Sequence, residues 1–318
     1  LIDDVTLYSA KLIIPVTGPV IIDGAVAIHG DRVVHVGKRR WVLKALKQEM
    51  TAHGTIHERH WDGVLTPGLI NAHTHLQYSG MVQVGQGTYD RFRAWELAFN
   101  EVYAEAQKTQ PWKQWAEDGA RQMVESGTTA AADIVTDLDA AGALASQGMH
   151  GIAYWEVMGW HNAEWMEKGR TELIRQLRRM NEEQLPNLGI SPHAPYTLES
   201  EPFVDLPDIA RQLNMRLHIH LAETPLEAGT YPPVLTTYSA ADWSDHDWES
   251  YRQLKEVGKG ASAIQFVDQL GSLGPDVHIA HGVWANGEDR RILRQRGVGV
   301  ALCPRSNRIT NTGKDAPV

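Results

Sequence analysis

The most restrictive feature of this sequence is a regular alternation of short apolar stretches with longer amphipathic ones, which starts at Leu65. Such alternation is typical of βα units, in which each helix returns the chain to the same end of a parallel sheet. Helical patterns separate the strands, and Gly297 is well placed to end the last helix. The sequence therefore predicts an α/β fold, a (β/α)8 TIM-like barrel that lacks its eighth unit. The seven candidate strands are Leu65–His75, Thr128–Val135, Gly151–Val157, Leu188–Pro195, Met215–Glu223, Val277–Val283 and Val298–Pro304.

The segment before this alternation has a different pattern. Short strands separated by turn signals run from Leu7 to Gly37, and Gly30-Asp31 is expected to close a hairpin. A helix is expected over residues 39–50. We therefore predict a small β-sandwich domain over residues 1–64, completed by further C-terminal residues, and a barrel domain over residues 65–318.

Three histidines near the end of the first domain, His53, His57 and His60, are spaced as a helical metal site could be. Gly54 and Thr55 interrupt any helix at this point. These histidines are therefore interpreted as surface residues.

Four of the candidate strands end in histidine motifs. In a barrel of this type the active site lies at the C-terminal ends of the strands, so the four motifs are expected to meet at one mouth. A single strand-end histidine is usually a structural residue, but several buried imidazoles need partners and cost desolvation. A metal hydrolase site is therefore favoured over simple packing. The motifs contain His73 and His75, then His193, then His218 and His220, and finally His278 and His281.

The spacing of His73 and His75 places both side chains on the same face of a strand. Two neutral imidazoles aimed at one point form half of a metal site, although such a pair also arises by chance. His218 and His278 lie one layer deeper than their neighbours and are expected to be core or supporting residues. Imidazole ligands suit zinc and ferrous iron alike, so both metals stay open.

The motifs TPGLINAHTH, SPHAPYT, HIHLAET and HIAHGV, in this order, resemble the amidohydrolase superfamily and more closely its branch of metal-dependent deaminases. The resemblance covers nearly the whole chain. It implies one divalent metal ion, Zn or Fe(II), held by His73, His75 and His220. It also implies that Glu223 shuttles protons, that His281 contacts the water on the metal, and that His193 contacts the substrate.

The same resemblance implies hydrolytic release of ammonia from an adenine-type nucleoside, such as aminodeoxyfutalosine, methylthioadenosine or S-adenosylhomocysteine. Glu156, at the end of the third strand, is a candidate substrate contact or a charge at the barrel rim. Trp95, with Phe92 and Glu101 on the helical stretch that follows the first strand, could line an apolar wall or a core-facing stripe. Two alternatives stay open: hydrolysis of another ring or C–N bond (guanine, cytosine or chlorotriazine type), and a non-catalytic metal-binding role. Glu223 argues against the latter.

Bulk properties limit the partners. A net charge of −9 and a pI near 5.9 argue against nucleic acid or an anionic membrane as the main partner. A single cysteine, Cys303, excludes an intrachain disulfide, and the cytoplasm is the expected compartment. The expected partner is a small-molecule nucleoside, with a homodimer as one option for the quaternary state.

Two expectations concern the edges of the site. The irregular stretch Pro225–Ser250 follows a strand, where barrel enzymes place substrate-covering loops. The resemblance also implies an aspartate ligand after the eighth strand, and Asp315 precedes that strand. We therefore expect these 318 residues to continue in a longer polypeptide that supplies the strand and the ligand.

Overall fold

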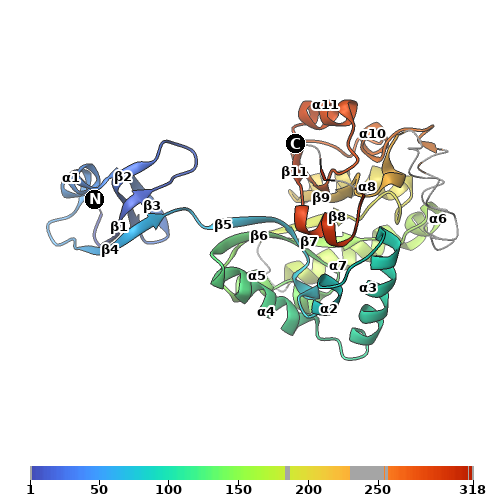
Figure 1. The fold of residues 1–318 in the computed structure, drawn as a ribbon, viewed down its shortest axis with the longest axis horizontal. Coiled ribbons are helices and arrows are strands. Elements are labelled where there is room, and N and C mark those ends of the chain that lie inside the picture. Colours follow the sequence, from blue (N-terminus) through green and yellow to red (C-terminus); the bar gives the residue numbers. More distant parts are fainter. Residues whose placement is uncertain (1, 183–186, 230–253, 255–256, 314, 317–318) are drawn as a thin grey trace. The chain divides into compact units, whose positions relative to one another are not determined.

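The computed structural model describes residues 2–182, 187–229, 254, 257–313 and 315–316, shown as coloured ribbon in Figure 1. The chain divides into two compact units, Leu1–Leu69 and Ile70–Val318, and each is described by itself. No helix within the described residues has both the length and the apolar composition that crossing a membrane requires.

The N-terminal unit is a four-stranded sheet in the order β3-β2-β1-β4. One helix, α1 (Arg39–Glu49), packs Val42 and Leu46 against Val5 and Leu7 of the sheet. Gly30, with φ of 59°, turns the chain between β2 and β3 at the predicted hairpin. The strands are β1 (Val5–Ile13), β2 (Ile21–His29), β3 (Arg32–Lys38) and β4 (Ile56–Leu65).

Strand β4 was not expected from the sequence. It pairs in parallel with β1 at the edge of the sheet and ends at Leu65, so the expected strand Leu65–His75 begins only at Leu69. Its side chains are mostly polar and exposed because an edge strand has one pairing partner and few covering neighbours. His57 and His60 lie on this strand and His53 precedes it, and all three are exposed, as expected.

The second unit contains the parallel sheet that the alternation predicted. Seven strands lie in the order β11-β10-β9-β8-β7-β6-β5, and all seven predicted strands are present. This confirms the α/β, TIM-like barrel class. The strands are β5 (Leu69–Thr74), β6 (Thr128–Val135), β7 (His150–Val157), β8 (Leu188–Pro192), β9 (Arg216–Leu221), β10 (Val277–His281) and β11 (Gly299–Ala301).

Two of these strands end where the backbone enters the left-handed region. Ala222 has φ of 55° directly after β9, and His281 has φ of 77° at the end of β10. Residues other than glycine adopt this conformation at a cost, and they do so mainly where surrounding contacts impose it. Both turns lie at the C-terminal ends of the strands, so the functional side chains project from tightly specified backbone.

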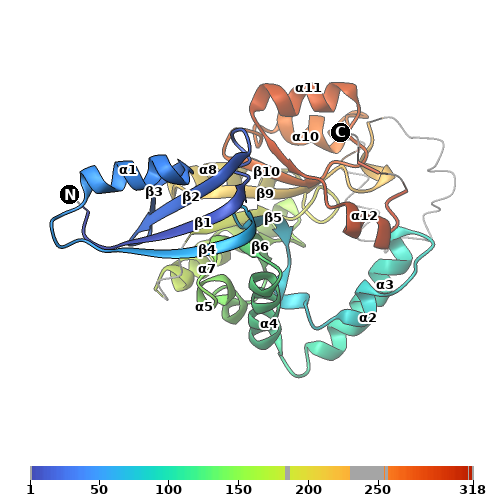
Figure 2. The same ribbon diagram turned by 60° about the vertical axis from the view of Figure 1, so that its left-hand side comes forward.

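Helices cover the outer face of the parallel sheet (Figure 2). Phe203 and Leu206 of α8 and Trp165 are fully buried against Ile190 and Leu217 of the sheet, forming the main core. α11 begins at the N-cap Asn286 and ends at Gly297, which has φ of 71°, as predicted. The helices are α2 (Val82–Gly85), α3 (Phe92–Ala106), α4 (Trp112–Glu125), α5 (Ala143–Ser146), α6 (Asn162–Glu164), α7 (Arg170–Glu182), α8 (Ser200–Gln212), α10 (Ala263–Gln269), α11 (Gly287–Arg296) and α12 (Pro304–Ile309).

The expected loop Pro225–Ser250 falls mostly outside the described residues. Its first part is the 3₁₀ helix η4 (Pro225–Glu227), which directly follows the turn after β9. Residues 230–250 lie outside the part of the chain that the structure describes.

Candidate active site

A cavity of about 480 Å³ lies at the C-terminal ends of the parallel strands. Five histidines line it, from the ends of four different strands, and they are His73, His75, His193, His220 and His281. Apart from His73 and His75, they are far apart in the sequence, so only the barrel brings the four strand ends together. In the structure, the strand-end motifs therefore meet at one mouth, as predicted.

Three of these imidazoles have their Nδ1 atoms anchored by different parts of the fold. Nδ1 of His220 lies 3.2 Å from the main-chain oxygen of His193, and Nδ1 of His281 lies 2.8 Å from Oδ1 of Asn307. Nδ1 of His73 lies 3.0 Å from Nε2 of His218. A carbonyl or amide oxygen only accepts hydrogen bonds, so Nδ1 of His220 and of His281 carries the proton. The Nε2 atom of each ring is then unprotonated, and its lone pair can bind a metal or accept a hydrogen bond.

One ligand atom from each of His73, His220 and His281 lies within 4.8 Å of the other two. His75 stands at the side of this trio, with its Nε2 3.3 Å from Nε2 of His220. Its Nδ1 is buried and has no hydrogen-bond partner among the described residues. Of the predicted ligands His73, His75 and His220, His220 is therefore the one that lies close to both of the others. The assignment of the ligands stays a prediction.

The protonation state of the histidines suits metal ligation. Burial lowers the pKa of His75 to about 4, and burial with neighbouring imidazoles lowers the pKa of His73 and His220 well below the ordinary value. The imidazoles are therefore neutral at pH 7, and a neutral imidazole is the form that binds a metal. Clustered neutral nitrogens, with Nδ1 of His73 and of His220 held by hydrogen bonds on the far side of the ring, fit one divalent metal ion.

Glu223 supplies the carboxylate beside this cluster. Its side chain is 5% exposed and lines the same cavity. Oε1 lies 3.4 Å from Nε2 of His281, and Oε2 accepts a hydrogen bond of 3.2 Å from the hydroxyl of Tyr196. The carboxylate is thus held at Oε2 by Tyr196, with Oε1 beside the His281 imidazole, and it faces the cavity as proton transfer to a bound molecule requires.

The two other predicted polar contacts also line the cavity. Burial raises the pKa of Glu156 to about 8, and its Oε1 is buried without a hydrogen-bond partner in the described residues. Oε1 of Glu156 lies 3.9 Å from Nδ1 of His220. His193 is anchored through Nδ1, 2.8 Å from the hydroxyl of Thr197. Both side chains have polar atoms available to a ligand, and their substrate roles stay predictions.

An apolar part of the cavity lining comes from α2 and α3. Phe92, Trp95 and Phe99 follow one face of α3. The ring centroids of Phe92 and Trp95 are 5.3 Å apart, and those of Trp95 and Phe99 are 5.5 Å apart. Trp95 lines the cavity, as one of the two interpretations proposed. Glu101 is a correction, because it is exposed and belongs to the outer face of the helix. Helical periodicity places Glu96 and Asn100 on the cavity side instead.

His218 and His278 differ more than the sequence suggested. His218 is fully buried below the cavity, as expected of a supporting residue. His278 is exposed, which corrects the expectation that it too is a core or supporting residue. Its register partner on β11 is Gly299, which has no side chain to cover the imidazole.

Several residues at the site were not predicted individually. Asn307 on α12 orients His281, and Tyr196 orients Glu223. Both lie in stretches that carry the family resemblance, but nothing in their spacing specifies these contacts. Glu227 could have been found, because Thr224 and Glu227 have the spacing of a helix capping box.

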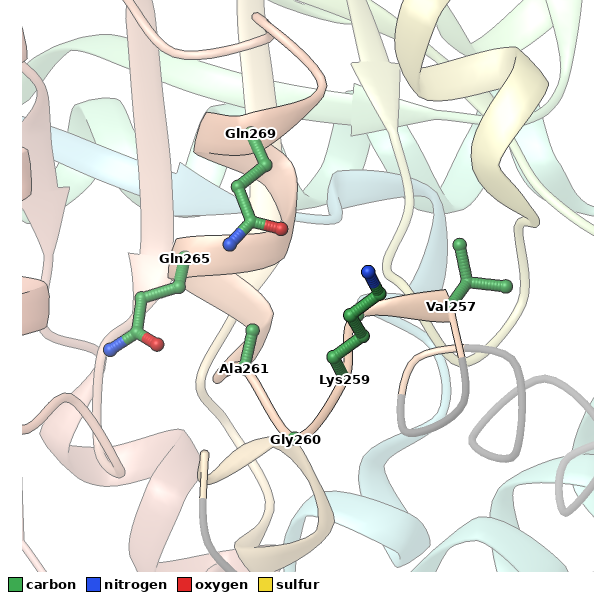
Figure 3. Close-up of a pocket in the computed structure, with 7 residues that line it drawn as sticks. Val257, Lys259, Gly260, Ala261, Gln265 and Gln269 are labelled. Atoms are coloured by element: carbon green, nitrogen blue, oxygen red, sulfur yellow. The ribbon is translucent and has the colours of Figure 1, made fainter.

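A second hollow lies beside α10 (Figure 3). Lys259, Gln265 and Gln269 lie around it, and the described residues that line it include neither histidine nor carboxylate. The cavity at the strand ends is therefore the stronger candidate for a reaction site.

Known proteins resemble this chain in sequence. The sequence model of the amidohydrolase family matches residues 64–231, more than half of the chain. A 5-methylthioadenosine/S-adenosylhomocysteine deaminase of Thermococcus kodakarensis is 30% identical over 250 residues, which are 77% of this chain and 52% of that protein. The chain thus spans about half the length of this relative.

Two solved structures share the fold. The aminofutalosine deaminase of Helicobacter pylori, in complex with methylthio-coformycin, superposes with a TM-score of 0.74 at 17% identity, over 98% of this chain and 72% of that one. An adenosine deaminase of Xanthomonas campestris with bound zinc superposes with a TM-score of 0.70 at 19% identity, over 99% of this chain and 66% of that one.

Proposed function

The chain belongs to the amidohydrolase family, and from this premise we propose that it is a metal-dependent aminohydrolase that releases ammonia from an adenine-type nucleoside. The observation that carries the proposal is the placement of Glu223. Its carboxylate lies 3.4 Å from the His281 imidazole, on the wall of a cavity lined by five histidines. A site that only held a metal would have no use for a carboxylate held in this way.

His73, His75 and His220 would hold the metal, and zinc and ferrous iron both suit them. When bound, the metal supplies Lewis acidity that activates water at neutral pH. The chain contributes neutral nitrogens whose orientation is set before binding. Nδ1 of His220 is committed to the main-chain oxygen of His193, so its Nε2 is directed to the site.

Glu223 would move the protons that deamination requires. Water adds to the ring carbon that carries the amino group, the adjacent ring nitrogen gains a proton, and the amino group leaves as ammonia. A carboxylate can take one proton from the attacking water and give it to the ring nitrogen. It can then take the second proton from the newly added hydroxyl and give it to the amine, which leaves as ammonia as the C–N bond breaks and the C=O bond forms. Tyr196 holds Oε2 of Glu223 in place for these transfers, and Oε1 lies beside the His281 imidazole.

The walls of the cavity support a nucleoside as the substrate. Glu156 and His193 offer polar atoms beside the histidine cluster, where the edge of a purine would lie. Trp95 and Phe99 offer a flat apolar surface on the other side, suited to the sugar and its 5′-substituent. Relatives named for deaminating methylthioadenosine and S-adenosylhomocysteine support the same substrate class.

A coupled ammonia assay on the metal-loaded protein tests the proposal. The panel is methylthioadenosine, S-adenosylhomocysteine, 5′-deoxyadenosine, adenosine and aminodeoxyfutalosine, with guanine, cytosine and a chlorotriazine as competing classes. We expect turnover of adenine-type nucleosides only. Turnover confined to a competing class, or none at all, would contradict it.

A further inference from the structure

Glu227 is a fully buried carboxylate one turn beyond Glu223. It is the last residue of η4, is 1% exposed, and does not line the cavity. Its Oε1 accepts a hydrogen bond of 2.9 Å from the main-chain N–H of Ala222. Its Oε2 accepts bonds of 2.9 Å from the N–H groups of both Glu223 and Thr224. One side chain therefore holds three consecutive amides, and the middle one belongs to Glu223.

The segment held by Glu227 is one that needs support. Ala222 has φ of 55°, a left-handed conformation that alanine rarely adopts. From the other side, the carbonyl of Ala222 accepts a hydrogen bond of 2.8 Å from the N–H of Trp284, in the loop that follows His281. The backbone that carries Glu223 is thus fixed between the Glu227 carboxylate and the loop after β10.

A carboxylate is the side chain that this arrangement requires. Three N–H donors point at its two oxygens, and both oxygens of a carboxylate accept. A glutamine has the same shape, but its NH₂ group would take the place of one oxygen. It would then face the main-chain N–H groups that donate to that oxygen, and two donors cannot form a hydrogen bond with each other. Burial, together with the charge of Glu223, raises the pKa of Glu227 to about 8, whereas the three N–H bonds favour the charged form. A second acid beside a catalytic one is costly for a purely structural role.

We propose that Glu227 is a positioning residue for Glu223, holding its backbone so that the carboxylate reaches Tyr196 and His281 in the geometry for proton transfer. This inference rests on the proposed deaminase function. Glu227 does not line the cavity, and its hydrogen bonds within the described residues go to the turn at 222–224, so it acts through that turn. Its loss should therefore slow the chemical step without weakening substrate or metal binding.

The test compares Glu227→Gln with the wild-type protein, both metal-loaded, on the nucleoside that the wild-type protein deaminates. We expect kcat to fall about 10- to 100-fold, as is typical when a supporting partner is lost, while KM and metal content stay within about twofold. Glu227→Asp keeps two acceptor oxygens but withdraws them by one methylene, so a smaller loss of kcat is expected. If Glu227→Gln does not fold, Glu227→Asp is compared with the wild-type protein instead.

A double-mutant cycle separates positioning from general destabilisation. If Glu227 acts through Glu223, adding Glu227→Gln to Glu223→Gln should lower kcat by less than about twofold. Loss of the same factor in both backgrounds, or an unchanged kcat in Glu227→Gln, would overturn the inference. Faster amide hydrogen exchange over residues 221–227 should accompany the loss of rate.

Asp289 provides the matched control. It is another fully buried carboxylate, which accepts hydrogen bonds from the side chains of Ser262 and Gln265 and from the N–H of Asn286, on the helical side of the barrel. Asp289→Asn should lower the melting temperature and leave kcat unchanged. A wild-type protein that deaminates no nucleoside would instead refute the proposed function, and this inference with it, a result distinct from an active wild type with an unaffected Glu227→Gln.

Discussion

The Nδ1 atom of His281 lies 2.8 Å from Oδ1 of Asn307, and the amide nitrogen of Asn307 in turn donates 2.6 Å to the carbonyl of Leu302. The second bond fixes which way the amide faces, because only its nitrogen can donate to a carbonyl. Asn307 therefore presents its oxygen to His281 and selects the tautomer with the proton on Nδ1. The Nε2 lone pair then faces Glu223 and the cavity.

Asn307→Ala should release this constraint. We expect kcat to fall about 10- to 100-fold, because His281 can then adopt the other tautomer or rotate away from Glu223. Steady-state kinetics with metal analysis measures the effect. A rate within twofold of wild type would show that the tautomer of His281 does not matter.

Glu223→Gln should keep the metal and lose most of the rate. Glutamine preserves the shape and the contact with Tyr196 but cannot carry a proton between substrate atoms. A general acid–base contributes about 10²- to 10⁴-fold, and a group that serves several transfers should lie near the upper limit. Single-turnover measurement of ammonia release gives the chemical rate, and near wild-type turnover would assign proton transfer to another group.

Chelation should abolish turnover, and added zinc or ferrous iron should restore it, because no other electrophile lines the cavity in the described residues.

Elemental analysis of variants then assigns the ligands. We expect His220→Ala and His75→Ala to lose the metal, and His281→Ala to keep it. The exposed His278→Ala is the control and should keep metal and activity. Loss of metal in His281→Ala with retention in His75→Ala would replace the predicted ligand set by the trio of His73, His220 and His281.

Trp95→Ala should weaken substrate binding more than it slows the chemistry. The indole lines the cavity and contacts Phe99, but it belongs to α3 and not to the strand ends that carry the histidines. Loss of this apolar surface should raise KM by about tenfold with a smaller change in kcat. Leu97→Ala, on the exposed face of the same helix, is the control and should leave KM unchanged. Equal KM values for the two variants would remove Trp95 from the substrate site.

The N-terminal unit should lose stability in acid through Glu58. A hydrogen bond from Arg39 is the main cause that lowers its pKa from 4.5 to about 2, and a hydrogen bond from Ser9 adds to it. The folded state therefore binds this proton less readily than the unfolded state. Its stabilisation is complete above pH 4.5 and is lost as the pH falls through about 2.

Between pH 7 and pH 3, the unfolding free energy of wild type should fall by about 1 kcal/mol more than that of Glu58→Gln, since both partners are partly exposed. Urea titrations at the two pH values measure the difference. Glu125→Gln, at an exposed ion pair with Arg121, should behave as wild type does. Identical pH dependence in Glu58→Gln would show that this ion pair contributes nothing to acid stability.

Local features of the sequence determined the class of fold. The alternation of strands and helices placed all seven strands of the parallel sheet, and Gly297 marked the end of α11. These features act over a few residues, through side-chain periodicity and allowed backbone angles, so no knowledge of distant neighbours is needed. Strand β4 was missed for the complementary reason, since its pairing with β1 rather than its own pattern holds it extended.

The sequence also determined which residue types gather at the strand ends, because the barrel topology carries every such end to one mouth. Only the tertiary structure decided how they meet. His73 contacts His218 across 145 residues of sequence, His281 takes its tautomer from Asn307, and Glu227 holds the backbone of Glu223. Each relationship depends on which atom lies within hydrogen-bonding distance of another. That distance is set by the packing of separate elements, and no local pattern records it.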